Sequence, residues 1–216
     1  TYLLNTFIAQ ARKRGKKVSV TATTGLAATH LGGNTIHSWS GIGVSDHLPN
    51  NFFERLSKTR RDVISKTDVL IIDEISMLHD FRLDMIDKVL RTVRENDQPF
   101  GGIQLVMSGD FFQLPPVNRP NEQGGGFVVY SDAWQELQPA VLYLKRQYRQ
   151  NDEQLLEILT ALRTGDVRRR HVEALLARTE IEPPDGDITE LHTVNVDVDD
   201  INIQKLAELP GEERSY

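Results

Sequence analysis

Helical and strand-like apolar patterns alternate along the first third of the chain. Apolar residues at helical spacing predict a first helix from Tyr2 to Arg14, which Gly15 ends. A short β-type run follows at 18–22, and the small residues after Gly25 predict a second helix at 26–31. The polar stretch at 45–66 indicates short helical pieces.

Two continuous apolar runs predict strands that are buried on both faces of a sheet. They lie at 68–72 and 103–107, and a helix is predicted between them at 81–95. Strands that alternate with helices favour a doubly wound α/β fold with a parallel sheet. In such sheets the ligand crevice lies beyond the carboxyl ends of the strands.

The pattern is less regular in the second half of the chain. Residues 118–126 form a predicted loop rich in Pro, Gly and Asn. Pro183-Pro184-Asp185-Gly186 is the predicted linker or boundary. Short strands are predicted at 127–129, 140–144 and 188–192, and helices at 131–137, 153–163, 168–178 and 199–208.

Composition is that of an ordinary soluble protein. The 216 residues are 39% hydrophobic and 26% charged, and no run of about 18 apolar residues predicts a membrane span. The first residues resemble no signal peptide. The absence of cysteine excludes a disulfide scaffold and thiolate metal sites, which fits a reducing compartment.

The charge is unevenly distributed. Between 180 and 216, eleven acidic residues against two basic ones give −9, so the remainder carries +3 of the total of −6. The basic residues of that remainder cluster at 12–17, 58–61 and 168–170. Such clusters are also typical of solvated helix faces, so charge neither supports nor excludes nucleic-acid binding.

Asp73-Glu74 follows the apolar run at 68–72 directly. One interpretation is an acidic cap of the next helix. The other is the acid pair of a P-loop ATPase, in which the Asp helps to hold Mg²⁺ and the Glu orients and deprotonates the attacking water. Magnesium needs only one or two carboxylates besides phosphate oxygens and water.

The segment Gly109-Asp110-Phe111-Phe112-Gln113-Leu114-Pro115-Pro116 follows the next predicted strand. It should therefore reach the same edge of the sheet as Asp73-Glu74. A Gln at that edge can hydrogen-bond a γ-phosphate and its attacking water, although a polar residue in a Pro-terminated turn is the alternative.

A phosphate-binding loop that ends in Gly-Lys-Ser/Thr does not occur in the sequence. Gly124-Gly125-Gly126 is no substitute, because no Lys-Ser/Thr follows it. Thr1 stands directly before a predicted helix, where the last residue of such a loop belongs. We therefore expect the loop to lie upstream of Thr1, and the chain alone to hydrolyse little or no ATP.

Five motifs in order resemble the Pif-type (petite integration frequency) DNA helicases, which are 5′-to-3′ enzymes of superfamily 1B related to RecD. The likeness extends from Thr1 to about Gly211 and is carried by the segments 21–28, 35–43, 73–78, 100–102 and 109–116. The resemblance implies a first RecA-like domain at 1–150 with a wedge-type insertion near 45–66. It implies a helical connection at 151–182 and the beginning of a second RecA-like domain at 183–216.

The resemblance also implies a nucleotide site for ATP and Mg²⁺. Thr1 matches the phosphate-loop Thr that ligates Mg²⁺, and Asp73 and Glu74 match the magnesium-associated acid and the catalytic base. Gln113 matches the Gln that couples the nucleotide site to DNA. Arg149 matches the arginine that reaches the γ-phosphate across the cleft between the motor domains.

The DNA-binding residues implied by the resemblance fall in two segments. Hydroxyl groups and helix starts at 21–43 suit phosphate contacts without base reading. Trp39 could stack on a base, but its apolar surroundings favour the core, and His37 could equally be a structural histidine. The candidates are Thr23, Thr24, His37 and Ser38 in the first segment and Lys58, Arg60 and Arg61 in the wedge.

The function implied is ATP-dependent 5′-to-3′ translocation on single-stranded DNA with unwinding of tailed duplex DNA, by a monomer without membrane contact. Such a protein is cytoplasmic in a prokaryote and nuclear or mitochondrial in a eukaryote, and it is not secreted. Two alternatives remain open at this point. One is a DNA-stimulated ATPase that translocates without unwinding, and the other is a non-catalytic nucleic-acid-binding relative.

Overall fold

The computed structural model describes residues 1–118, 123–146, 148, 151–182 and 189–211. The chain divides into two compact units, Thr1–Arg146 and Gln147–Tyr216, and each is described by itself. No helix among the described residues is both long enough and apolar enough to cross a membrane.

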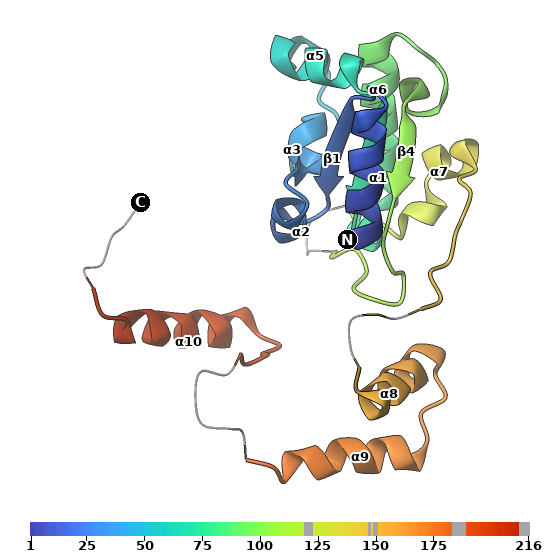
Figure 1. Cartoon of the computed structure of the whole chain (residues 1–216). Coiled ribbons are helices and arrows are strands. Elements are labelled where there is room, and N and C mark those ends of the chain that lie inside the picture. Colours follow the sequence, from blue (N-terminus) through green and yellow to red (C-terminus); the bar gives the residue numbers. More distant parts are fainter. Residues whose placement is uncertain (119–122, 147, 149–150, 183–188, 212–216) are drawn as a thin grey trace. The chain divides into compact units, whose positions relative to one another are not determined.

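The first unit is built on a parallel sheet of the order β2-β1-β3-β4 (Figure 1). Its strands are β1 (Val18–Ala22), β2 (Asn34–Thr35), β3 (Val69–Asp73) and β4 (Gln104–Met107). The α/β fold with a parallel sheet is therefore confirmed. The central position of β3 explains why its sequence is an uninterrupted apolar run, since both of its faces are covered.

Helices surround this sheet. The α-helices of the first unit are α1 (Tyr2–Lys13), α2 (Gly25–His30), α3 (Ile36–Ser40), α4 (Phe52–Arg55), α5 (Lys58–Lys66), α6 (Asp80–Arg94) and α7 (Asp132–Leu137). Short 3₁₀ turns are η1 (Ile75–Met77), η2 (Pro99–Gly102) and η3 (Val128–Tyr130). The predicted helices at 2–14, 26–31, 81–95 and 131–137 are confirmed, as are the helical pieces within 45–66.

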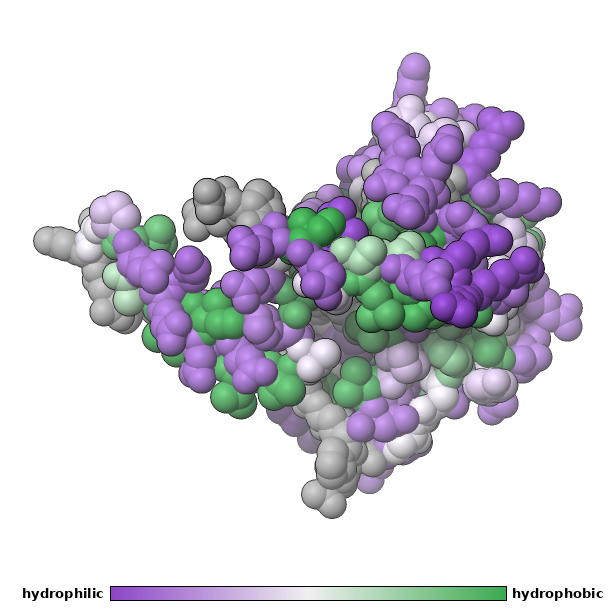
Figure 2. Space-filling view, turned by 90° about the horizontal axis from the view of Figure 1, so that it is seen from below, coloured by the Kyte–Doolittle hydropathy of each residue, from purple (hydrophilic) through white to green (hydrophobic). Residues whose placement is uncertain are grey.

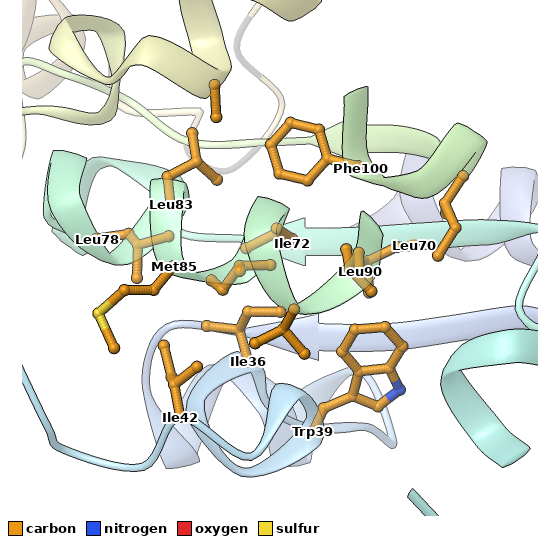
Figure 3. Packing of buried hydrophobic residues seen from close by; sticks show 14 of the residues in the cluster. Ile36, Trp39, Ile42, Leu70, Ile72, Leu78, Leu83, Met85, Leu90 and Phe100 are labelled. Atoms are coloured by element: carbon orange, nitrogen blue, oxygen red, sulfur yellow. The ribbon is translucent and has the colours of Figure 1, made fainter. Parts of the chain in front are cut away.

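The two faces of the sheet carry separate hydrophobic clusters. Val69 and Ile71 point to the α1 face, where they pack with Leu4 and Ile8. Leu70 and Ile72 point to the opposite face and join a larger cluster beneath α3 and α6 (Figure 3). This alternation along β3 is the period of two expected for a strand. It fixes α1 and α6 on opposite faces and leaves the carboxyl edge of the sheet for a site.

Trp39 lies in the larger cluster, where Figure 3 places it beside Ile36. Its side chain is 7% exposed. The interpretation of Trp39 as a core residue is confirmed, and a base-stacking role is wrong for this conformation.

Three predicted strands are wrong. Residues 127–129 instead contain one isolated bridge from Phe127 to His79 and then η3, in which only Val128 is buried. Residues 140–144 have no regular structure, and their apolar side chains are exposed. Residues 189–192 are also irregular, while Ile188 lies outside the described residues. A short apolar run forms a strand only where a neighbouring strand offers its hydrogen-bonding edge, and sequence does not reveal that partner.

The second unit consists of helices in its described part. They are α8 (Glu153–Thr164), α9 (Arg169–Thr179) and α10 (Asn195–Glu208), so the predictions at 153–163, 168–178 and 199–208 are confirmed, the last with a longer helix. Many apolar side chains of this unit are exposed, among them Leu162, Leu176 and Leu206. Figure 2 shows apolar residues that reach the surface between hydrophilic ones.

Candidate functional site

A cavity of about 320 Å³ lies at the carboxyl edge of the sheet in the first unit. It brings together five residues predicted from the sequence, although they are far apart along the chain: Thr1, Thr24, Asp73, Glu74 and Gln113. The remaining lining residues are Leu26, Ala27, His30, Leu31, Ser76, Met77 and Leu114. The cavity is therefore where the crevice of a parallel α/β sheet is expected.

Asp73 is fixed as the last residue of β3. It pairs with Ala22 of β1, and its carbonyl accepts a hydrogen bond of 3.1 Å from the backbone amide of Thr23. The Ser108 hydroxyl, which follows β4, donates to the Asp73 carboxylate. Neighbours on both sides therefore hold the carboxylate at the mouth of the cavity.

Glu74 adopts a left-handed backbone conformation with φ 55° and ψ 42°. Such a conformation costs a residue other than Gly about 1–3 kcal/mol, and it persists where surrounding contacts enforce it. One such contact is the hydrogen bond of 2.9 Å from the Thr23 hydroxyl to the Glu74 carbonyl. Asp73 ends the strand and Glu74 forms this turn, and both residues line the same cavity.

The loop after β4 packs directly against the turn after β3. The Ile75 amide donates to the Ser108 carbonyl at 3.0 Å, and a Cβ on Gly109 would lie 2.9 Å from Ile75 Cγ2. Gly109 is thus required for the close approach of the two segments. The loop places the exposed side chain of Gln113 at the cavity, with its Nε2 3.4 Å from Asp110 Oδ2.

The donors at this cavity fit a magnesium ion. The Thr1 hydroxyl and the Asp73 carboxylate belong to residues that line the same space. No group of three or more His, Cys, Asp or Glu residues suited to a metal occurs in the described part of the chain. That donor set suits an ion that takes most of its ligands from water and phosphate oxygens.

The threonines after β1 are already engaged in the fold. The Thr24 side chain caps α2 by accepting from the Ala27 amide at 3.3 Å, while Thr23 bonds Glu74 as described. A segment predicted to contact DNA is therefore bonded directly to a segment predicted to bind nucleotide. That link consists of the Thr23 hydroxyl, which donates to the Glu74 carbonyl, and the Thr23 amide, which donates to the Asp73 carbonyl.

His37 and Ser38 lie in the first turn of α3, just beyond the carboxyl end of β2. The Thr35 side chain caps this helix by accepting from the Ser38 amide at 3.2 Å. The half-buried His37 ring contacts Arg82 of α6, with 3.3 Å between His37 Nε2 and Arg82 Nη1. Burial, the Arg82 guanidinium and His79 lower the pKa of His37 from 6.5 to about 4.

The three wedge candidates lie on α5, at the end of the sheet opposite to α2 (Figure 1). Lys58 is exposed. The Arg60 side chain packs near Gly41, where a Cβ would lie 3.0 Å from Arg60 Cδ. Arg61 donates to the backbone carbonyls of Phe53 and Leu56. The helix α5 that carries these cations contacts α3, which contains His37 and Ser38, whereas Thr23 and Thr24 precede α2.

Arg149 and the linker Pro183–Gly186 lie outside the described residues. The second unit has a cavity of its own, about 450 Å³, between α8 and α9. It contains the ion pair of Glu157 with Arg170, at 2.6 Å, and none of the residues predicted from the sequence. We therefore place the candidate site in the first unit.

Three residues at these sites did not emerge from the sequence. Ser108 stands one position before Gly109, so its place at the end of a predicted strand was a usable signal. Ser76 lines the cavity with a buried hydroxyl that has no partner among the described residues. Arg82 belongs to a helix with no local sign of its role, since its partners lie 36 or more positions away.

The family model described as "PIF1-like helicase" matches residues 1–168. Among curated proteins, the ATP-dependent DNA helicase Pif1 of Psychrobacter sp. (strain PRwf-1) is 43% identical over 100% of this chain and 34% of its own length. The ATP-dependent DNA helicase RRM3 of Saccharomyces cerevisiae is 38% identical over 97% of this chain and 30% of its own. The chain thus spans about a third of the length of these relatives.

Solved structures of Pif1 helicases are also similar to this chain. A crystal structure of Pif1 helicase from Candida albicans matches with a TM-score of 0.84 and 35% identity, covering 98% of this chain and 49% of that one. Pif1 helicase from Bacteroides in complex with ADP-AlF3 and ssDNA matches with a TM-score of 0.78 and 32% identity, covering 92% and 48%.

Proposed function

The chain belongs to the PIF1-like helicase family, and on this basis we propose that it is the ATPase part of an ATP-dependent DNA helicase. The observation that carries the proposal is the single cavity shared by Thr1, Asp73, Glu74 and Gln113. The relatives named as ATP-dependent DNA helicases and the neighbour solved with ADP-AlF3 and ssDNA support the same activity.

In this proposal Glu74 is the general base. It takes a proton from the water that attacks the γ-phosphorus of ATP, while the bond from that phosphorus to the β,γ-bridging oxygen breaks and leaves ADP and phosphate. Gln113 holds the water and the γ-phosphate by hydrogen bonds, and Asp73 with Thr1 holds Mg²⁺. The ion, when bound, neutralises charge on the phosphate oxygens.

Charge that develops on the transferring phosphoryl group needs a cation at the far side of the site. We assign this role to Arg149, as the family resemblance implies. The proposed motor closes on ATP and opens after hydrolysis while it moves 5′ to 3′ along single-stranded DNA, with tailed duplex DNA as the substrate for unwinding. We expect a monomer to suffice.

Thr23 offers a route by which the two ligands affect one another. Its hydroxyl donates to the Glu74 carbonyl at 2.9 Å, and its amide donates to the Asp73 carbonyl at 3.1 Å. A DNA strand that shifts the segment after β1 would therefore shift the backbone of both acids. This coupling supports DNA-stimulated hydrolysis over a constitutive ATPase.

The test is an ATPase assay on the full-length gene product with and without single-stranded DNA. Wild type should be stimulated by DNA. Glu74→Gln should lower kcat by about 10²–10⁴-fold, because the general base is lost, and should still bind ATP. Glu95→Gln, which changes an exposed carboxylate at the end of α6, outside the cavity and the wedge segment, is the matched control. DNA binding without hydrolysis by the wild type would contradict the proposal and favour a non-catalytic relative.

A further inference from the structure

The contact between Arg82 and His37 has a chemical consequence for the imidazole ring. Arginine only donates hydrogen bonds. At 3.3 Å from Arg82 Nη1, His37 Nε2 must therefore accept and carry no proton. A neutral ring with a bare Nε2 carries its proton on Nδ1. The less common tautomer of histidine is thus selected here by a side chain from a different helix.

The Nδ1–H group of this tautomer has no partner among the described residues, and the ring is only half-buried. It lies in the first turn of α3, beyond the carboxyl end of β2, in the segment proposed to contact DNA. A neutral donor there suits a phosphate oxygen of a DNA strand, which only accepts hydrogen bonds. A donor without a charge adds a directed contact without ion pairing.

We infer that Arg82 is a positioning residue, which fixes the orientation and tautomer of His37 so that its Nδ1–H is offered to a phosphate oxygen of single-stranded DNA. This inference rests on the proposed function. It adds a residue that no motif of the family resemblance includes.

The geometry around Arg82 is that of an anchored side chain. Arg82 is 12% exposed, and its Nη2 donates to the Val44 carbonyl at 3.2 Å and to Asp46 Oδ1 at 3.1 Å. The other carboxylate oxygen of Asp46 accepts from the Gln123 amide at 3.1 Å. Because Val44 and Asp46, two partners outside α6, restrain the guanidinium, it can in turn restrain the histidine ring.

Electrostatics keep the ring neutral. The pKa of His37 is lowered to about 4 by burial and by the adjacent Arg82, with a further contribution from His79. The guanidinium also contributes to lowering the pKa of Asp46, after the hydrogen bond from Gln123. A protonated His37 would present a donor at both nitrogens and would lose its bond with Arg82. The tautomer is therefore stable throughout the neutral pH range.

The first test combines nitrogen NMR of the histidine ring with DNA binding by the full-length protein. Arg82→Met keeps an unbranched side chain but removes every donor. We expect His37 to shift from the Nδ1–H to the Nε2–H tautomer and the affinity for single-stranded DNA to fall about tenfold. Arg91→Met, on the same helix but bonded to Asp87 and Glu136, is the matched control and should change neither.

A second pair of variants keeps the test decisive if Arg82→Met does not fold. The amide nitrogen of Asn occupies the position of Nδ1, whereas that of Gln occupies the position of Nε2. His37→Gln should therefore bind single-stranded DNA at least about fivefold more weakly than His37→Asn.

The outcomes separate the inference from the proposed function. Wild type that binds DNA, with equal affinities in the two His37 variants or an unchanged tautomer in Arg82→Met, overturns the inference alone. Wild type that does not bind single-stranded DNA at all overturns the proposed function and the inference together.

Discussion

At the scale of single residues, Ser108 shows how the site depends on a neighbour that is not itself a proposed ligand. Its hydroxyl donates to the Asp73 carboxylate. Hydrogen bonds to charged groups contribute about 1.5–3 kcal/mol, so their loss is measurable. The carboxylate proposed to hold Mg²⁺ would lose one of the contacts that orient it.

We therefore predict that Ser108→Ala raises the Mg²⁺ concentration for half-maximal ATPase activity about tenfold or more. Ser19→Ala is the control. Ser19 is a half-buried serine of β1, and its hydroxyl is hydrogen-bonded to the Thr67 hydroxyl at 2.8 Å, away from the cavity. A magnesium titration of the two variants measures the effect. Equal half-saturation in wild type and Ser108→Ala would remove Ser108 from the site.

A second residue-scale prediction concerns pH. The pKa of His37 is about 4 in the folded protein and ordinarily 6.5, so the unfolded chain binds this proton more readily. The contribution of His37 to stability is complete above pH 6.5 and is lost as the pH falls toward 4. Between these pH values the free energy of unfolding should change by at most about 1.4 kcal/mol per pH unit. The change should be smaller than this limit because the ring is only half-buried.

Denaturant unfolding between pH 7.5 and pH 4.5 measures this slope, and His37→Asn should make it shallower. The charged or titratable groups that act on the ring are Arg82 and His79, with Asp46 acting through Arg82. Arg82→Met should raise the pKa of His37 in an NMR titration. An identical slope in wild type and His37→Asn would contradict the assignment.

The part of the site that could be predicted is the part that the strand ends determine. Asp73 and Glu74 stand at the end of β3 and Gln113 follows β4 in one parallel sheet, and such ends meet at a common edge. The strand at 103–107 was predicted to be buried on both faces, which is wrong, because β4 lies at the edge of the described sheet and none of its residues is fully buried. Arg82 could not be predicted, because its role comes from the folding of 37–46 against α6. Ser76 stands two positions after Glu74 in the sequence, but only the structure reveals that the Ser76 hydroxyl is buried.

At the scale of elements, prediction worked where a run was long or flanked by clear ends. β3 and α6 are examples, since a buried apolar strand and a long amphipathic helix each repeat their signal. β2 and α3 have two and five residues, too few for a period to appear. The run at 140–144 has the side chains of a strand, but sequence does not show which edge, if any, would pair with it.

Gly33, just before β2, tests how closely this end of the sheet is packed. A Cβ there would lie 2.2 Å from the Val20 carbonyl oxygen, which belongs to the backbone of β1 and cannot move aside cheaply. We predict that Gly33→Ala lowers the free energy of unfolding by about 1–3 kcal/mol or more. Gly25→Ala meets no atom within 4 Å and should change stability by no more than about 1 kcal/mol. Urea unfolding of both variants measures the two changes in stability. Equal midpoints would mean that the backbone around Val20 moves away from the added Cβ at little cost.

At the scale of the whole molecule, the two units differ in how much they bury. Thr1–Arg146 contains both hydrophobic clusters and the sheet. In the described part of Gln147–Tyr216, Ile158, Ala161 and His171 are the buried residues, and α10 has none. Helices of 11–14 residues are marginal in water unless packing supports them. The chain also has no cysteine with which to cross-link a small unit.

This difference predicts separate behaviour of the two units when each is made alone. Residues 1–146 should unfold in one cooperative transition, because the sheet is covered on both faces within that range. Residues 147–216 should have weak helical circular dichroism and no sharp melting transition, since the apolar faces of α8 and α9 remain largely exposed. Thermal melts followed at 222 nm (the wavelength at which helices absorb circularly polarised light differentially) compare the two fragments directly. A cooperative melt of 147–216 would mean that its helices bury more surface together than the described residues account for. The unit with the candidate site would then not be the only part of the described chain that folds by itself.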